Sequence, residues 1–420
     1  MKTALLGLLC LLCASMPAIG DDLSIEERVR KLEQEVSDLK KENAQLRQDL
    51  GVEVVARQAS VKAPEKADVK TAAKVDVKPA GSENALQLGG LLQAQSEAGD
   101  RGDSRFSDSN ARFFLRRVRV KVSGRFAEGF DFRAELELAG SLSDTSAFRA
   151  QLTDGYINWN RFGAANVRVG QFKTPFGYEQ LYSDSRLPTA ERTLVNDRLT
   201  SGRQIGVQVS GEADHKRLTY AAGIFNGSGT NQNFNDNDKF MTAARVSFVP
   251  FSGRLLGKQA HWSVGANGLR TTDSSIASAA DFGFDSSPST PAKDNLFTGR
   301  RAGIGYDSQL EVGPFALWGE YLRGTFEPSD RVPLSRLRSS GWYGMATWFV
   351  IADKLQVVGR LETFDPNNNL AGDATRSTVL GANWYLKQPD LKLQLDWMRS
   401  AVPGLSKAQQ KVIARMQAVF

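Results

Sequence analysis

The side chains best suited to chemistry in this sequence are the basic residues of one short stretch, from Arg112 to Lys121. In an extended strand Arg117, Arg119 and Lys121 point to the same side, with about 7 Å between successive side chains. Guanidinium groups hold phosphate or carboxylate through paired hydrogen bonds, so this row could carry an anion along a wall. Alternatively, the row pairs with acids of the following segment and forms a neutral lining. Those acids are Asp131, Glu135 and Glu137.

A second group of basic residues lies in and beside a long polar segment, residues 174–202. A segment of this length next to a closed sheet can fold inward and narrow a passage. Its own basic residues and the two that frame it are Lys173, Arg186, Arg192, Arg198 and Arg203. It also carries four acids, Glu179, Asp184, Glu191 and Asp197, so the segment is not a strongly positive filter. We predict an ion path formed by Arg117, Arg119, Lys121, Lys173, Arg192, Arg198 and Arg203.

The sequence offers little for catalysis. Its two histidines, His215 and His261, fall at a short turn and at a strand edge. Its two cysteines, Cys10 and Cys13, lie in the first 20 residues. There is no nucleotide-binding loop and no zinc-ligand spacing. We therefore expect no enzyme, no catalytic residue, no metal, no cofactor and no nucleic-acid partner.

From residue 84 to 420 the chain repeats strands of about ten residues in which apolar and polar side chains alternate. In the clearest strand, Phe130, Phe132 and Leu136 share one face, while Asp131 and Glu135 share the other. Hydrocarbon on one face and charge on the other indicates a sheet between lipid and water. This part contains 29 Arg, 11 Lys and 33 Asp plus Glu, which is an excess of positive charge. Such an excess on a channel wall would favour anions.

Short turns and long polar segments alternate between these strands. Seven short turns, such as Gly313-Pro314, and eight longer segments, such as 271–299, join 16 strands. This asymmetry is typical of bacterial outer-membrane barrels, with short turns in the periplasm and long loops outside. The predicted fold is all-β: a 16-stranded antiparallel transmembrane β-barrel over residues 84–420, preceded by a short α-helical coiled coil.

The first 83 residues fall into three zones. Residues 1–20 contain a basic residue, a short apolar run and the small residues Ala18 and Gly20, as in a cleaved secretory signal peptide. Residues 21–50 follow a heptad pattern, with Ile25, Leu32 and Leu39 at one core position, which predicts a coiled coil of two or three chains. The alternative is a lone amphipathic helix. Residues 51–83 are rich in Ala, Val, Lys and Pro and are predicted to be a flexible periplasmic linker.

Several segments together resemble the phosphate- and polyphosphate-selective porins, the family of porins O and P. They are Phe114 to Arg119, Val169 to Gly177, Glu191-Arg192, Arg203 to Val207 and Tyr220 to Gly227. The resemblance spans residues 85–420 and implies a trimeric barrel of 16 strands with an arginine ladder and a lysine-bearing constriction. The ladder would map to Arg117, Arg119 and Lys121, and the motif lysine to Lys173. The terminal Phe420, in phase with an apolar face, is similar to the signal read by the outer-membrane assembly machinery.

These observations predict an outer-membrane porin of a Gram-negative bacterium that passes small hydrophilic solutes with a preference for anions such as phosphate. A general-diffusion porin remains an alternative. Another is a structural tether, in which the barrel anchors an N-terminal extension that binds peptidoglycan. The expected partners are outer-membrane lipid and two further copies of the chain.

Overall fold

The computed structural model describes residues 86–106, 111–140, 148–277, 280–282, 296–329 and 336–420, together with residues 30, 34, 37, 38, 41, 76 and 77. The chain divides into two compact units, residues 1–70 and 71–420. In the first unit the five described residues are helical. The predicted signal peptide, the heptad core of the predicted coiled coil and almost all of the predicted linker lie outside the described residues.

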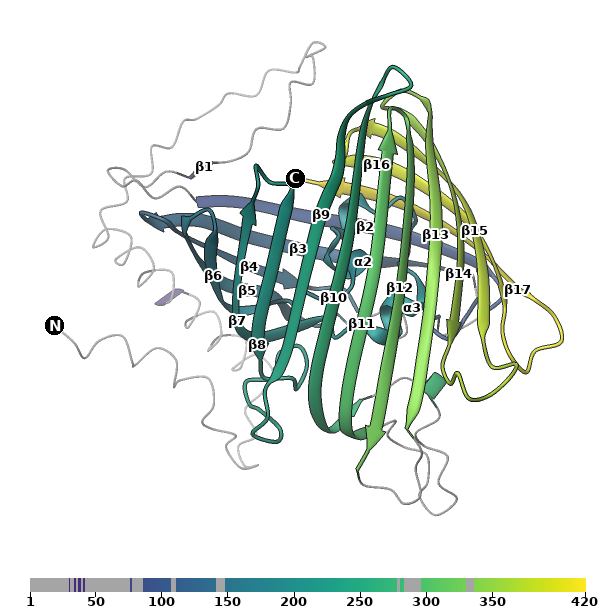
Figure 1. The fold of residues 1–420 in the computed structure, drawn as a ribbon. Helices are drawn as coiled ribbons and strands as arrows, with labels where there is room; N and C mark the ends of the chain where they lie inside the picture. The colour runs from purple at the N-terminus through teal and green to yellow at the C-terminus, as the bar shows by residue number, and fades with distance from the viewer. Residues whose placement is uncertain are drawn as a thin grey trace, which may run out of the picture. The chain divides into compact units, whose positions relative to one another are not determined.

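The second unit is built on one antiparallel sheet that closes on itself (Figure 1). The two-residue strand β1 (Asp76–Val77) pairs with the start of β2. The closed barrel consists of sixteen longer strands, because β17 pairs with β2. They are β2 (Leu86–Gly99), β3 (Arg112–Ala127), β4 (Phe130–Glu137), β5 (Gln151–Phe162), β6 (Ala165–Lys173), β7 (Arg203–Ala213), β8 (Leu218–Phe225), β9 (Met241–Leu255), β10 (Lys258–Ala277), β11 (Leu296–Val312), β12 (Phe315–Pro328), β13 (Leu337–Ile351), β14 (Leu355–Asp365), β15 (Thr375–Lys387), β16 (Leu391–Ala401) and β17 (Gln409–Val419). The predicted strand number and antiparallel order are confirmed.

The alternation of side chains explains why these segments form a barrel wall. In β4 Leu136 is 42% exposed on the outside, whereas its neighbour Glu135 is buried on the inside. In β17 Val412 and Met416 face outward and Arg415 is buried inward. No described helix is long and apolar enough to cross a membrane.

The two kinds of connection lie at opposite ends of the strands, as predicted. One predicted short turn, residues 250–256, is shorter in the structure because β9 continues to Leu255. The first barrel strand starts at the short-turn end, and the last strand ends there with Phe420, whose backbone pairs with Gly90. The barrel therefore begins and ends at the same rim.

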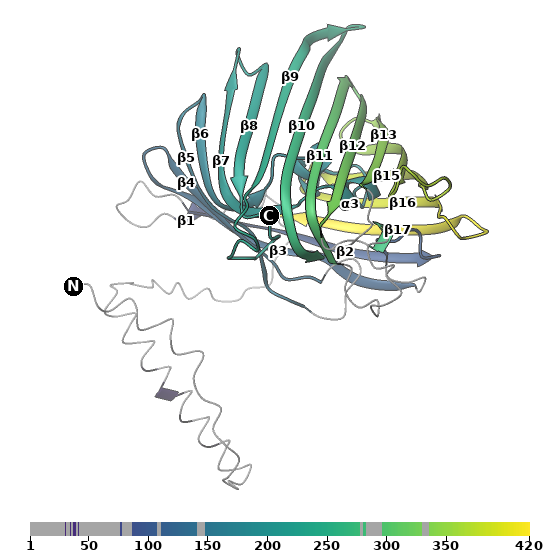
Figure 2. The same cartoon turned by 60° about the horizontal axis from the view of Figure 1, so that its bottom comes forward.

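The connection between β6 and β7, residues 174–202, folds into the barrel and is here called the inner loop. It contains the short helices α2 (Tyr178–Leu181) and α3 (Leu194–Leu199) and the 3-10 turn η1 (Asp184–Arg186), which lie within the ring of strands (Figures 1 and 2). Leu194, Val195 and Leu199 of α3 are buried in an apolar cluster that includes Phe326 of β12 and Phe364 of β14. The prediction that this segment folds inward is confirmed.

Glycines in the wall make room for the inner loop. A Cβ on Gly341 of β13 would lie 2.7 Å from Cγ2 of Val195. A Cβ on Gly303 of β11 would lie 2.7 Å from Cζ of Phe176. A larger side chain at Gly303 would push Phe176 off the wall, because a contact of this length is shorter than van der Waals packing allows. At Gly341 it would also meet the carbonyl oxygen of Thr363 in β14, at 2.4 Å, and disturb the wall itself.

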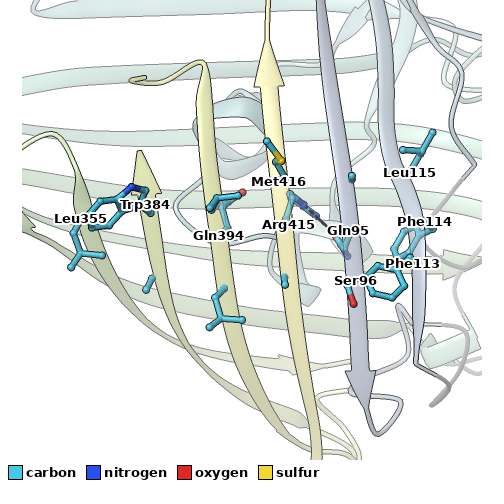
Figure 3. Close-up of a pocket in the computed structure, with 15 residues that line it drawn as sticks. Gln95, Ser96, Phe113, Phe114, Leu115, Leu355, Trp384, Gln394, Arg415 and Met416 are labelled. Carbon is cyan, nitrogen blue, oxygen red and sulfur yellow. Dashed lines mark hydrogen bonds between the residues drawn. The ribbon is translucent and has the colours of Figure 1, made fainter. Parts of the chain in front are cut away.

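An apolar depression of about 760 Å³ lies on the outer face across the seam where β17 meets β2 (Figure 3). Small side chains form its floor, among them Ala94, Ala382 and Ala414. Phe113 of β3 and Trp384 of β15 stand at its two sides. Its apolar lining suits lipid or another protein surface, but not water.

Candidate functional site

The candidate site is a cavity inside the barrel between the inner loop and the wall of strands β3 to β9. It has a volume of about 300 Å³. The inner loop contributes Pro175, Leu181, Ser183 and Asp184. The wall contributes six basic side chains, Arg119, Arg133, Arg168, Lys173, Arg203 and Arg245. Three acids share the lining, Glu135, Asp154 and Asp184, so the basic residues outnumber the acidic ones two to one.

Four of the six basic residues are held by carboxylates. Arg119 lies 2.7 Å from Glu137 and 2.6 Å from Asp184. Arg245 forms a bidentate pair with Asp307, with distances of 2.6 and 2.8 Å. The other two, Arg133 and Arg203, share the acids Glu135 and Asp154. Pairing of this kind fixes the side chains and lowers the charge that they present to a passing ion.

Lys173 and Arg168 are different, because neither has a described carboxylate within 4.0 Å. The Lys173 ammonium donates one hydrogen bond, to the carbonyl of Tyr182 at 3.1 Å, and has two further N–H groups. The Arg168 guanidinium donates through Nε to Asn158 at 2.7 Å and lies 4.2 Å from the centre of the Tyr156 ring. These two side chains can bind an anion in the cavity without first breaking an ion pair.

Two acids fasten the inner loop to strands β3 and β17 of the wall. Asp184 contacts Arg117 at 3.3 Å and Arg119 at 2.6 Å, and it also pairs with Arg192 of the loop. Burial alone would raise the pKa of Asp184, but the charges of Arg117, Arg192 and Arg119 outweigh it and hold that pKa well below its ordinary value. The loop is therefore anchored by an ionised carboxylate at neutral pH.

Glu191 forms the second anchor. It accepts a two-pronged hydrogen bond from Arg116, at 2.8 and 2.9 Å, and pairs with Arg415 of β17. Burial raises the pKa of Glu191, but the charges of Arg116, Arg415 and Arg117 act more strongly together and lower it below its ordinary range. Asp184 and Glu191 are thus engaged in ion pairs that hold the inner loop in place.

A β-bulge explains how two consecutive arginines both reach the inner loop. In the pairing of β2 with β3, Gln93 faces Arg117 and Ala94 faces Leu115, so Arg116 has no partner in the ladder. A bulge of this kind breaks the strict alternation of sides. As a result, Arg116 reaches Glu191 while Arg117 reaches Asp184.

The structure places three of the seven predicted ion-path residues at the cavity: Arg119, Lys173 and Arg203. Arg117 is 5% exposed and bonds to Gln93 and Asp184 behind the loop. Arg192 and Arg198 lie in the loop itself and hold it through Asp184 and Asp281. Lys121 sits opposite Glu135 in the strand register and does not line the cavity.

Sequence analysis missed Arg133, Arg168 and Arg245 at this cavity. A usable signal existed for Arg168, because it alternates with the outward-facing Val167 and Val169 and must therefore face the interior. The same signal holds for Arg133 between Phe132 and Ala134. Among the residues that the structure describes, no group of three or more His, Cys, Asp or Glu is arranged to hold a metal ion.

A family described as phosphate-selective porin O and P matches residues 86–420. The chain belongs to this family. It is therefore an outer-membrane porin, a channel for passive diffusion and not an enzyme.

Solved structures agree on the fold. OmpT of Vibrio cholerae, folded in vitro, is 11% identical, with a TM-score of 0.57 over 82% of this chain and 100% of that one. The anion-selective porin from Comamonas acidovorans is 13% identical, with a TM-score of 0.56 over 80% of this chain and 100% of that one. A trimer form of OmpT gives 10% identity and a TM-score of 0.55, over 81% and 100%. No curated protein sequence matches the chain.

Proposed function

We propose that this porin passes small anions, with phosphate-like ions preferred, along the cavity beside the inner loop. The observation that carries the proposal is the pair of basic side chains without a carboxylate partner, Lys173 and Arg168, in a lining where six basic residues meet three acidic ones. Anions concentrate in such a lining, and oxyanions can accept several N–H groups at once. The description of the family and the anion selectivity of the porin from Comamonas acidovorans also support a preference for anions.

Reversal potential in a planar lipid bilayer tests this proposal. The refolded full chain is placed under a salt gradient of KCl, and phosphate is then added as a competing ion. We expect an anion-selective current that phosphate reduces. A large current with equal anion and cation permeability would instead identify a general-diffusion porin, and the proposal would be wrong.

We also propose that three copies assemble through the apolar depression at the seam of β17 and β2 (Figure 3). Small side chains such as Ala94 and Ala414 let a neighbouring wall approach closely, and Phe113 and Trp384 add large apolar area. The trimer form of OmpT, a fold neighbour, supports this assembly. The apolar lining favours a protein or lipid neighbour over water.

For residues 21–83 we propose a periplasmic extension that can touch the peptidoglycan, which is an anionic polymer. Its heptad pattern and its lysines support this reading, and so does the position of both barrel ends at the short-turn rim. Deleting residues 23–83 should leave the single-channel conductance unchanged and reduce binding of the protein to isolated cell wall. Equal wall binding with and without the segment would rule out the tether.

A further inference from the structure

Six arginines point outward, away from the channel, near the ends of the strands where the long loops lie. They are Arg270 (β10), Arg300 (β11), Arg323 (β12), Arg338 (β13), Arg376 (β15) and Arg399 (β16). Each lies on the face that carries exposed apolar side chains further along its strand, such as Tyr306 in β11 and Trp342 in β13. All six strands lie within the consecutive run from β10 to β16, so the arginines follow one side of the barrel.

None of these six arginines has an ion pair or a side-chain hydrogen bond within the part of the chain that the structure describes. The outward-facing acid on β12, Glu327, pairs with Arg336 instead. By contrast, the arginines inside the barrel are mostly paired, as Arg301 of β11 is with Asp273. An arginine on the lipid side is strongly unfavourable at the bilayer midplane and nearly neutral near the interface, so these positions are tolerable only at the headgroup level.

Two of the six meet in a groove. It has a volume of about 570 Å³ and spans β13 to β16 on the outer face. Arg376 and Arg399 line one side, Trp342 and Leu361 the other, and the hydroxyl-bearing Thr363 and Thr378 lie between them. In the strand register Arg376 is opposite Thr363, and Arg399 is opposite Thr378.

The groove therefore offers cations, hydroxyls and an apolar wall to one ligand. Glu362 also borders it, but this side chain points into the barrel, where it contacts Arg105 and Arg360. No carboxylate thus neutralises Arg376 or Arg399 from within the described wall. Guanidinium groups match phosphate through paired hydrogen bonds, and an aromatic ring such as that of Trp342 suits the border between headgroups and acyl chains.

We propose that this groove binds a lipid with phosphate on its head group, in the membrane leaflet next to the long loops. The phosphate lies between Arg376 and Arg399, and an acyl chain follows Leu361 and Trp342 toward the membrane core. A lipid is favoured over free phosphate because both arginines face away from the aqueous channel and stand beside apolar side chains. The site is separate from the proposed anion path.

Lipid binding to the purified, refolded chain in uncharged detergent tests the proposal. A diphosphorylated glucosamine lipid is titrated, and binding is followed by native mass spectrometry and by the rise in the unfolding temperature. The variant Arg376→Gln/Arg399→Gln should bind at least about tenfold more weakly, because each arginine donates charged hydrogen bonds to the phosphate. The variant Arg254→Gln is the matched control, since it removes an exposed arginine next to a short turn at the other end of the barrel.

The same lipid without its phosphates, and inorganic phosphate alone, complete the experiment. We expect weak binding of the first and no rise in unfolding temperature with the second. Equal binding by the wild type and the double variant, or by the lipid with and without phosphate, would overturn the proposal. If inorganic phosphate raises the unfolding temperature of the wild type but not of the double variant, the groove is a site for free anions, and the lipid proposal is overturned as well. Unchanged conductance of the double variant shows that this variant is folded. If the double variant does not fold, the single variant Arg376→Gln takes its place in the experiment.

Discussion

Asp184 anchors the inner loop and also adds a negative charge to the cavity lining, so removing its charge tests both roles. Asp184→Asn keeps the size of the side chain and removes its charge. Arg117, Arg119 and Arg192 then lose a shared carboxylate in a buried place. Removing one partner of a buried ion pair costs about 3 to 5 kcal/mol.

Remaining partners reduce this cost. Arg119 keeps Glu137 at 2.7 Å, and Arg192 keeps the backbone carbonyls of Glu179 and Tyr182 at 3.0 and 2.8 Å. We therefore expect the free energy of unfolding to fall by about 3 kcal/mol, the lower end of that range. Urea unfolding in lipid vesicles, followed by tryptophan fluorescence, measures it.

The control is Glu327→Gln, which breaks the surface pair with Arg336, whose side chains are 35% and 55% exposed. An exposed pair contributes at most about 1 kcal/mol. If Asp184→Asn and Glu327→Gln reduce the free energy of unfolding equally, Asp184 does not anchor the loop and the reasoning is refuted.

The same variant should change the ion selectivity of the channel. A unit charge acting on an ion about 6 Å away in water contributes about 0.7 kcal/mol, which is roughly a threefold change in local ion concentration. Because the lost charge is negative, the local anion concentration should rise and the local cation concentration should fall, each about threefold, so the anion-to-cation permeability ratio should rise about tenfold. Reversal potential under a KCl gradient measures the ratio, and a shift toward cations would contradict the charge assignment of the cavity.

Three further predictions follow from the loop and the outer face. Both anchor acids, Asp184 and Glu191, have lowered pKa values in the folded protein. Their contribution to stability is therefore complete above the carboxyl pKa of the unfolded chain, about 4, and is lost as the pH falls through the lower pKa of the folded chain. Urea unfolding should thus show no loss of this contribution between pH 8 and about 5 and a steep loss below about 4, and a loss centred near pH 6 would contradict it. Gly303→Val should displace Phe176 of the inner loop from the wall and yield a barrel that protease cleaves within residues 174–202. Resistance equal to that of the wild type would contradict the packing. Ala414→Trp should fill the outer depression and leave monomers in light scattering, and intact trimers would place the interface elsewhere.

The barrel could be predicted because its determinants are local. Successive side chains of a strand point to opposite faces, so Leu136 lies outside and Glu135 inside independently of distant parts of the chain. Short turns such as Gly313-Pro314 mark one rim of the barrel. The inward fold of residues 174–202 could be predicted from length and position. Each of these features can be read within a few dozen residues of the chain.

The charge arrangement of the site could be predicted only in part. Three residues of the predicted ion path, Arg119, Lys173 and Arg203, line the cavity because they lie on inward positions of strands beside the inner loop. The pairing of Arg117 with Asp184 joins residues 67 positions apart and depends on the path of the loop. The bulge at Arg116 breaks the alternation on which the prediction of a regular ladder depended. The composition of the loop therefore did not show how few of its acids face the cavity.

The central claim is that Lys173 and Arg168 give the cavity its preference for anions, and their joint removal tests it most directly. The variant Lys173→Gln/Arg168→Gln is compared in planar bilayers with Lys216→Gln, which removes an 80%-exposed lysine in a short turn. We predict that the double variant conducts but loses anion selectivity and inhibition by phosphate, whereas Lys216→Gln retains both. Unchanged selectivity and unchanged phosphate inhibition in the double variant would contradict the account.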